Sequence, residues 1–515
     1  MRKLSTIILF SFISYTLSYA QGYEIKIKFN AKNDTVMLGH HRATSLVPDD
    51  TVVTNKEGYA VLTGKNKLPG GMYFLFFSNK KYFDFLIGDN QTFSISGDTS
   101  DFSNIIYKGD KQNILFSFYQ KKMNTMGSQI REMYEKRKTL NKGDQAQLDK
   151  KIAKKRNELE MLYDKTVSEN EGLFFTTFLK ATKQVTVPPE ITDRQKQYEY
   201  FKKHYFDNFD YGDDRLMRTP IYEDRLMTYL DKLVVPDADS IISEVDKFIE
   251  SARDNDEHFK YILIHLFNKY VSSQRMIDEN VYIHIAEKYY IPEAEWSSPK
   301  FISDLKEKVK KQKKCLIGAK AFDINYNKLS DDTLEIKKTI KRNDFYKDRG
   351  LAIEKTDTTE TAEPKKAGIL KKWITEYKAS ENMYSTKSKY TILWFWTPDC
   401  SHCRKATPKF YDLYLEKKLK EKGVEVLAIY SNEGISDWKK FSDEQKKWLK
   451  FVKKHNLTQW TNAWNPFDLF RQNYNISSSP VLFVLDENYK ILAKKIEYTQ
   501  ALELIEHELK FKNEQ

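Results

Sequence analysis

The sequence predicts a multidomain chain with an N-terminal all-β sandwich, a central all-α helical domain and a C-terminal α/β fold. Three observations lead to this prediction. Short strand-like runs separated by turn residues come first, helical spacing of apolar residues follows, and strands alternate with helices near the C-terminus. The 515 residues also exceed what one hydrophobic core supports. We expect the parts to be 1–20, 21–109, 110–313 and 314–515.

Segment 1–20 has the pattern of a secretory signal peptide. Arg2 and Lys3 are positively charged, residues 7–17 form a short apolar run, and Ala20 offers a small residue for cleavage. The run is short and rich in Ser and Thr for a membrane span. We therefore expect cleavage, with an uncleaved anchor as the alternative, and a location in the periplasm or cell envelope.

Composition narrows the classes of partner. The net charge of +12 comes mostly from lysines along helical segments, which is typical of solvated helix faces. Export argues against nucleic acid as a partner and leaves a weak attraction to an anionic membrane surface. The chain has only three cysteines, Cys315, Cys400 and Cys403, so it is not a disulfide-stapled scaffold.

The pattern of residues 21–109 predicts short strands. Residues 23–29 alternate apolar and polar side chains without interruption, as a half-buried strand does. Similar runs occur at 51–54, 59–62, 72–77, 82–87 and 92–95. Turn residues separate these runs, which favours a small sandwich. His40 and His41 would point to opposite faces of one strand, so we interpret them as structural residues rather than metal ligands.

The middle part predicts a long αα-hairpin followed by further helices. Apolar residues keep near-helical spacing over 115–133, the pattern breaks at 141–144, and it resumes over 148–162. Later helices are expected to begin at 219–220 and 236–239, where Pro or Asp suits a first turn. No catalytic constellation is visible here, so we expect a spacer or a partner-binding role.

The C-terminal part alternates strands and helices. Expected strands are 390–396, 424–430, 481–485 and 490–493, and expected helices run from 400 to about 420, over 441–455, over 467–474 and from 499. An insertion at about 331–388 contains the polar tract 356–366, which has nothing to bury, so we expect it to be mobile.

The pair Cys400 and Cys403 is the feature that carries chemistry. Two cysteines separated by two residues can form a disulfide within one helical turn. The pair follows the apolar strand 390–396 at an expected helix N-terminus, where the dipole and free N–H groups stabilise a thiolate. Zinc would need four ligands, and the sequence has no second pair to supply them. We therefore expect thiol–disulfide exchange, with no metal and no cofactor.

Residues 390–515 resemble the thioredoxin-like domain of the exported TlpA/ResA class of thiol–disulfide oxidoreductases. The resemblance is carried by the aromatic strand ending at Trp396, the CxxC pair, Pro480 and the Leu-Asp-Glu turn at 485–487. Upstream, the layout is similar to envelope proteins that place a DUF4369-like β-domain and a DUF5106-like helical domain before such a module. These two upstream resemblances rest on pattern alone.

The resemblance implies a role for each residue of the site. Cys400 would be the nucleophile that forms a mixed disulfide, and Cys403 would resolve it. Pro480 would be a cis-proline facing the CxxC pair, with an ordinary loop proline as the alternative. The backbone of Ser479 would pair with an extended substrate. Trp396 would pack beneath the site, where it contacts substrate or serves only as core.

Neighbouring residues leave the direction of exchange open. His402 would stabilise the Cys400 thiolate and make the couple more oxidising, with Arg404 and Lys405 acting alike and Asp399 opposing them. Many thioredoxins carry a buried acid where this chain has Trp394, and exported reductases often have Glu where it has Ala406. Both usual proton acceptors for Cys403 are therefore absent. 

These inferences predict a cell-envelope thiol–disulfide oxidoreductase that exchanges disulfides with exported proteins, with the reductase direction slightly favoured by family. Its partners would be exported proteins with cysteines or disulfides and a membrane thiol-redox donor or acceptor. The alternative is an envelope partner-binding protein whose β and helical domains carry the main role. Cys315 is predicted to be a lone buried thiol, with a regulatory or intermolecular disulfide as the alternative. Substrate identity and oligomeric state are not encoded in these patterns.

Overall fold

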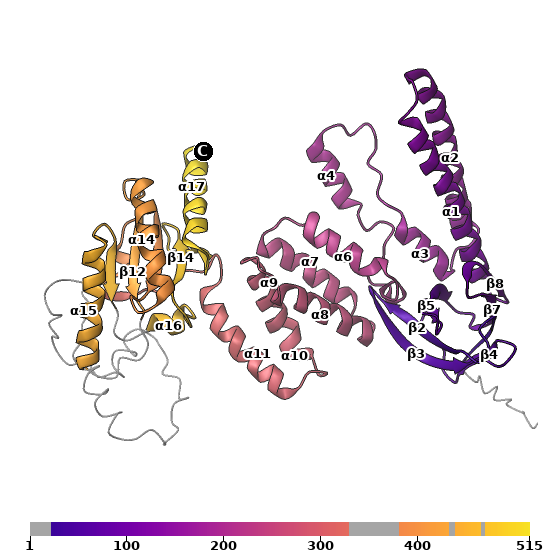
Figure 1. Cartoon of the computed structure of the whole chain (residues 1–515), viewed down its shortest axis with the longest axis horizontal. Coiled ribbons are helices and arrows are strands. Elements are labelled where there is room, and N and C mark those ends of the chain that lie inside the picture. The colour runs from indigo at the N-terminus through magenta and orange to yellow at the C-terminus, as the bar shows by residue number, and fades with distance from the viewer. Residues whose placement is uncertain (1–21, 329–380, 432–437, 465–468, 515) are drawn as a thin grey trace, which may run out of the picture. The chain divides into compact units, whose positions relative to one another are not determined.

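The computed structural model describes residues 22–328, 381–431, 438–464 and 469–514 (Figure 1). The predicted signal peptide and most of the predicted insertion lie outside these residues. The chain divides into two compact units. The first comprises residues up to 236 together with 240–262, and the second comprises 237–239 and everything from 263 onward. 

The N-terminal part is a sandwich of two four-stranded sheets, ordered β4-β1-β7-β8 and β3-β2-β5-β6. The strands are β1 (Tyr23–Phe29), β2 (Thr35–Arg42), β3 (Ser45–Val53), β4 (Tyr59–Gly64), β5 (Gly71–Phe76), β6 (Tyr82–Ile87), β7 (Thr92–Asp98) and β8 (Asp101–Lys108). Both sheets contribute to one apolar core, for example through Ile27 of β1 and Leu75 of β5. The predicted sandwich is confirmed. The strand-like runs predicted from the sequence do not include β2 and β8. In β8 only Ile105 and Tyr107 are buried, so the strand has a weak apolar pattern.

The two histidines of β2 lie within the sheet and each has a carboxylate partner. The Nδ1 atom of His40 is 2.8 Å from Asp49, and the Nε2 atom of His41 is 2.8 Å from Asp84. Both imidazoles are buried. These separate pairs agree with the structural interpretation. Across the described ranges, no group of three or more His, Cys, Asp or Glu side chains is placed to hold a metal ion.

The central part is helical and begins with the predicted αα-hairpin (Figure 1). Asn141 caps the second helix, since its side chain accepts the N–H of Asp144 at 3.1 Å. The helices are α1 (Lys111–Arg137), α2 (Lys142–Ser168), α3 (Phe174–Thr182), α4 (Arg194–Lys203), α5 (Asp214–Met217), α6 (Ile221–Lys232), α7 (Ala238–Ser251), α8 (Asp256–Val271), α9 (Asp278–Ile285), α10 (Ile291–Glu293) and α11 (Pro299–Gln312). The predicted starts near 220 and 238 are confirmed.

Helix α1 is joined to the sandwich through Asn113. The side chain of Asn113 is fully buried, and it accepts the N–H of Leu86 and donates to the carbonyl of Leu86, both at 2.7 Å. Leu86 belongs to β6, which is an edge strand of its sheet. Asn113 therefore satisfies backbone groups that an edge strand would otherwise leave unpaired.

The C-terminal part is a seven-stranded sheet, ordered β10-β9-β13-β12-β11-β14-β15, with helices on both faces. The strands are β9 (Asn325–Lys328), β10 (Glu381–Asn382), β11 (Tyr390–Trp396), β12 (Val424–Tyr430), β13 (Thr461–Trp464), β14 (Val481–Leu485) and β15 (Ile491–Lys494). The helices are α14 (Ser401–Glu416), α15 (Trp438–Lys454), α16 (Leu469–Asn473) and α17 (Tyr498–Glu514). The predicted α/β fold is confirmed.

The central strand β11 is buried along its whole length, because both faces of the sheet are covered. Ile392 and Trp394 share one apolar cluster with residues of α14, α15 and α17, whereas Leu393 and Phe395 share another with α16. Strand β11 pairs parallel to β12 and antiparallel to β14. No helix within the described residues is long and apolar enough to cross a membrane.

The Asn113 contact gives a test of how the sandwich holds its first helix. Substituting Asn113→Ala leaves the buried N–H and carbonyl of Leu86 without partners, which should cost about 3 kcal/mol. Hydrogen exchange of the β5 and β6 amides, measured by mass spectrometry, should then become roughly 100-fold faster. Gln120→Ala, at an exposed position of the same helix, is the control. Equal exchange in both variants would contradict this account.

Candidate functional site

Cys400 stands at the junction of β11 and α14. It is the N-cap residue of α14, and its Sγ atom accepts the N–H of Cys403 at 3.4 Å. The thiol therefore lies at the positive end of the helix dipole, which favours its anionic form. Cys400 is partly exposed, Cys403 is completely buried, and both are free thiols. 

The predicted proline loop lies opposite this thiol. The Cys400 Sγ atom donates to the carbonyl of Ser479 at 3.3 Å, and the Ser479–Pro480 peptide bond is cis. The cis bond implied by the resemblance is confirmed. The pairing of β11 with β14 explains the approach, because Phe395 near the end of β11 is opposite Val481 at the start of β14. The hydroxyl of Ser479 is also 2.6 Å from that of Ser431.

The two thiols differ in their environment. Burial, as the largest cause, raises the pKa of Cys403 to about 12. Cys403 is thus a neutral thiol over the physiological range, while Cys400 is open to solvent at the helix N-terminus. This asymmetry suits a pair in which Cys400 attacks and Cys403 follows.

Trp396 is not exposed at the surface, where a substrate could contact it. Its side chain is completely buried and packs against Trp448 and Phe451 of α15. The substrate-binding interpretation of Trp396 is therefore corrected: its surface is taken up by α15, and it supports the end of β11 from beneath. Of the two sequence alternatives, core packing is the one observed.

Trp394 and Ala406 stand where related domains often carry an acidic residue, and both pack into the domain. Trp394 is buried and its indole N–H donates to the hydroxyl of Thr407 at 3.1 Å. Ala406 packs against the apolar cluster that contains Trp394. His402 is exposed in the first turn of α14. Arg404 holds the loop before Cys400, since its guanidinium donates to the carbonyls of Pro398 and Asp399 at 2.9 and 3.0 Å.

Sequence reasoning missed an acid that the fold brings to this loop. Glu444 of α15 is buried, and its carboxylate accepts the phenolic O–H of Tyr430 at 2.6 Å. It also shares a hydrogen bond with the carboxyl group of Asp399, the residue before Cys400. Only its position on the inner face of an amphipathic helix could have drawn attention to Glu444 in the sequence.

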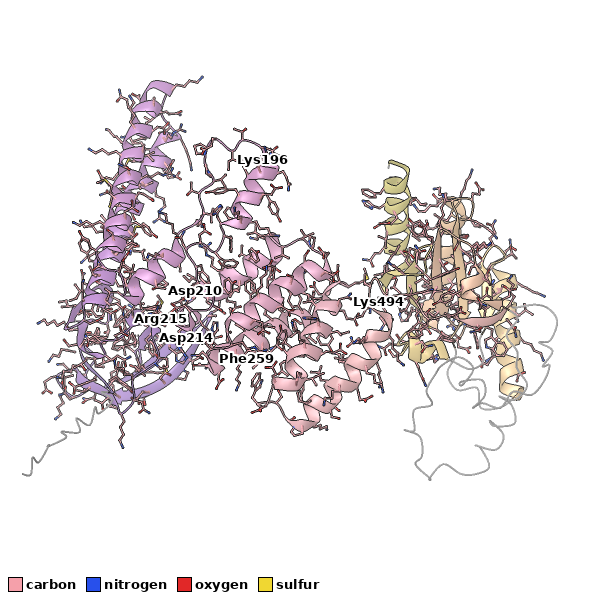
Figure 2. The ribbon with its side chains drawn as sticks, turned by 180° about the vertical axis from the view of Figure 1, so that it is seen from behind. Lys196, Asp210, Asp214, Arg215, Phe259 and Lys494 are labelled. Atoms are coloured by element: carbon pink, nitrogen blue, oxygen red, sulfur yellow. The ribbon has the colours of Figure 1, made fainter. Side chains whose placement is uncertain are left out.

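Cys315 is not brought to the CxxC pair. It belongs to the apolar cluster on the opposite face of the sheet from Cys403. Burial raises the pKa of its thiol. Its carbonyl accepts from the buried ammonium of Lys494 at 2.7 Å, and Lys494, labelled in Figure 2, also pairs with Glu279. The prediction of a lone buried thiol is confirmed.

Known protein families match the central and the C-terminal parts of the chain. Residues 142–316 match the family described as "Domain of unknown function (DUF5106)". Residues 388–491 match the family described as "Thioredoxin-like". A search of curated proteins found no match.

Several solved structures from Bacteroides and one from Cytophaga show some similarity to this chain. A thioredoxin-like protein from Bacteroides caccae is 19% identical, with 64% of this chain and 98% of that chain covered and a TM-score of 0.38. The thioredoxin domain of a thiol-disulfide oxidoreductase from Bacteroides vulgatus is 17% identical, with 37% and 97% covered and a TM-score of 0.23. A domain of a possible thiol-disulfide isomerase from Cytophaga hutchinsonii is 25% identical, with 38% and 97% covered and a TM-score of 0.24.

The fold and the family matches define the class of protein. Its C-terminal part is a thioredoxin-like domain, built on β11, α14 and the cis-proline loop. The chain joins this domain to an upstream DUF5106 region and an N-terminal sandwich.

The difference between the two thiols is testable by alkylation. At about pH 8, iodoacetamide should modify Cys400 and spare Cys403, because only thiolates react and Cys403 is buried and neutral. Modification of Cys403 should rise only as the pH approaches about 12. Mass spectrometry of the peptides reads the result, and denatured protein, in which all the cysteines react, is the control. Equal rates for both cysteines in folded protein would refute the assignment.

Proposed function

We propose that this protein is a thiol–disulfide oxidoreductase of the cell envelope that acts on exported proteins. The observation that carries the proposal is the arrangement of Cys400. It caps α14, has the buried Cys403 one turn behind it, and lies 3.3 Å from the carbonyl before Pro480. A partly exposed thiol with a protected partner is what sequential attack and resolution require.

The reaction conserves electrons and protons through two exchanges. The Cys400 thiolate attacks one sulfur of a substrate disulfide, forms a mixed disulfide and releases a substrate thiolate. Cys403 then loses its proton and attacks the Cys400 sulfur, which releases the second substrate thiolate. Two electrons have passed to the substrate, whose thiolates take up two protons. A second dithiol protein must then reduce the Cys400–Cys403 disulfide, and the reverse sequence would oxidise a substrate.

The Ser479 loop supports an extended substrate. Ser477 and Ser478 are exposed and Ser479 is half-buried, so backbone groups of this loop are accessible next to Cys400. A strand paired here would place its disulfide against the thiol. Exported proteins are proposed as substrates, and a membrane thiol-redox protein as electron donor, because segment 1–20 has the pattern of a signal peptide.

A second candidate is a partner-binding role for the upstream parts. A hollow of about 710 Å³ in the first unit is lined by Thr177, Lys180, Ser251 and residues 206–211, which include Asp210, labelled in Figure 2. If binding were the main role, a Cys400→Ser, Cys403→Ser double variant would return a strain that lacks the gene to the wild-type phenotype. Exchange as the main role requires that this variant fails.

The exchange activity should depend on Cys400 and not on Cys315. Reduction of insulin by the full chain, with dithiothreitol as electron source, should fall to background in Cys400→Ala, because no other thiol is exposed at the site. Cys315→Ala is the matched control and should keep the wild-type rate. Equal inactivity of wild type and Cys400→Ala would remove the basis of the proposal.

Removing the second thiol should trap the intermediate. In Cys403→Ser, the mixed disulfide on Cys400 cannot be resolved and should accumulate on envelope proteins. Non-reducing gels and mass spectrometry identify the captured partners, and Cys400→Ser, Cys403→Ser serves as the control. Recovery of no mixed disulfide from either oxidised or reduced envelopes would count against exchange.

A further inference from the structure

Two acidic side chains meet at the residue that precedes the CxxC pair. Glu444 is 9% exposed at its side chain, with one carboxylate oxygen bonded by Tyr430 at 2.6 Å and the other 3.3 Å from the Nζ atom of Lys447. Asp399 shares a hydrogen bond with Glu444 and lies 3.9 Å from the same ammonium. Glu444 is therefore a buried carboxylate with fixed partners, and it holds the side chain of the residue before Cys400.

The two carboxyl groups titrate as a pair. Burial and then the hydrogen bond with Glu444 raise the pKa of Asp399. Burial alone would also raise the pKa of Glu444, but the hydrogen bonds with Tyr430, Asp399 and Lys447 outweigh it and lower that pKa. The two carboxyl groups are therefore coupled, and the protonation of one depends on that of the other.

Residues of both charges flank Cys400 in the sequence. The first turn of α14 brings His402, Arg404 and Lys405, α15 brings Lys447, and the helix dipole adds to their effect. These groups favour the thiolate. Strand β11 and residues 401–408 contain no carboxyl group. Among the described residues, Asp399 and its partner Glu444 bring negative charge to the loop before Cys400.

We propose that Asp399 and Glu444 form a coupled pair that favours the release of electrons from the Cys400–Cys403 dithiol, with Glu444 as the positioning residue that holds the side chain of Asp399, the residue before Cys400. This inference rests on the proposed function and deepens it by assigning the reductase direction. Negative charge next to Cys400 destabilises its thiolate, and hence the reduced form, relative to the Cys400–Cys403 disulfide. The dithiol then passes two electrons to a substrate disulfide more readily, and a donor dithiol protein restores it.

The test compares redox equilibria of full-chain variants with glutathione. Asp399→Asn removes a negative charge and should shift the equilibrium about three- to tenfold toward the dithiol, where tenfold corresponds to about 30 mV. The shift is modest because Asp399 is half-exposed and screened by solvent. Glu444→Gln still accepts from Tyr430 and should shift the equilibrium in the same direction by less. The double variant should shift the redox equilibrium by less than the sum of the two single shifts, because Glu444 acts through Asp399.

Asp412→Asn is the matched control, since Asp412 is an exposed carboxylate farther along α14. A second readout is the rate of Cys400 alkylation against pH. Its midpoint should move to lower pH in Asp399→Asn, and the difference from wild type should shrink in high salt. Continued protection of Cys403 from alkylation in each variant shows that the domain remains folded.

The outcomes separate this inference from the proposed function. If wild type exchanges with glutathione and reduces insulin, but both acidic variants match Asp412→Asn, the pair does not set the direction. A shift toward the disulfide in Asp399→Asn would overturn the assignment of a reductase. If wild type neither exchanges nor reduces insulin, the proposed function fails, and the inference that rests on it fails as well.

Discussion

The antiparallel register between β11 and β14 is the constraint on which the site depends. It pairs Phe395, near the end of β11, with Val481, at the start of β14. The loops that follow and precede these residues carry Cys400 and Pro480, which are far apart in the sequence. A shift of one residue would turn each side chain of β14 to the other face and would move the Ser479 carbonyl away from the thiol. The pairing is held by strands that are buried on both faces, so it is strongly specified.

The chemistry follows from where α14 begins relative to this sheet. Its first turn projects Cys400 to the protein surface and turns Cys403 inward, against the cluster that contains Trp396 and Phe410. Burial keeps Cys403 protonated, whereas the helix N-terminus acts on Cys400. One helix start thus places two thiols in unlike environments. The neighbouring side chains of α15 then add the charge that distinguishes this site from a bare CxxC pair.

Much of the architecture was predictable because it depends on local patterns. The alternation in residues 23–29 produced β1, and the interruption at Asn141 produced the turn between α1 and α2. The CxxC pair and Pro480 were also visible in the sequence, through a resemblance to known thioredoxin-like domains. Strand β8 escaped prediction because Ser103 and Asn104 follow Asp101 and interrupt its pattern, and its pairing with β7 determines that it is a strand.

The sequence by itself determined the order of the three architectures, the spacing of Cys400 and Cys403, and the absence of an acid at Trp394 and Ala406. These are properties of residue types and short spacings. Only the tertiary structure decided that Trp396 is covered by α15 and that Glu444 reaches Asp399. Both contacts join residues distant in the chain, and no local spacing encodes them. They arise because α15 packs across the end of β11, which places a buried carboxylate next to the loop that precedes Cys400.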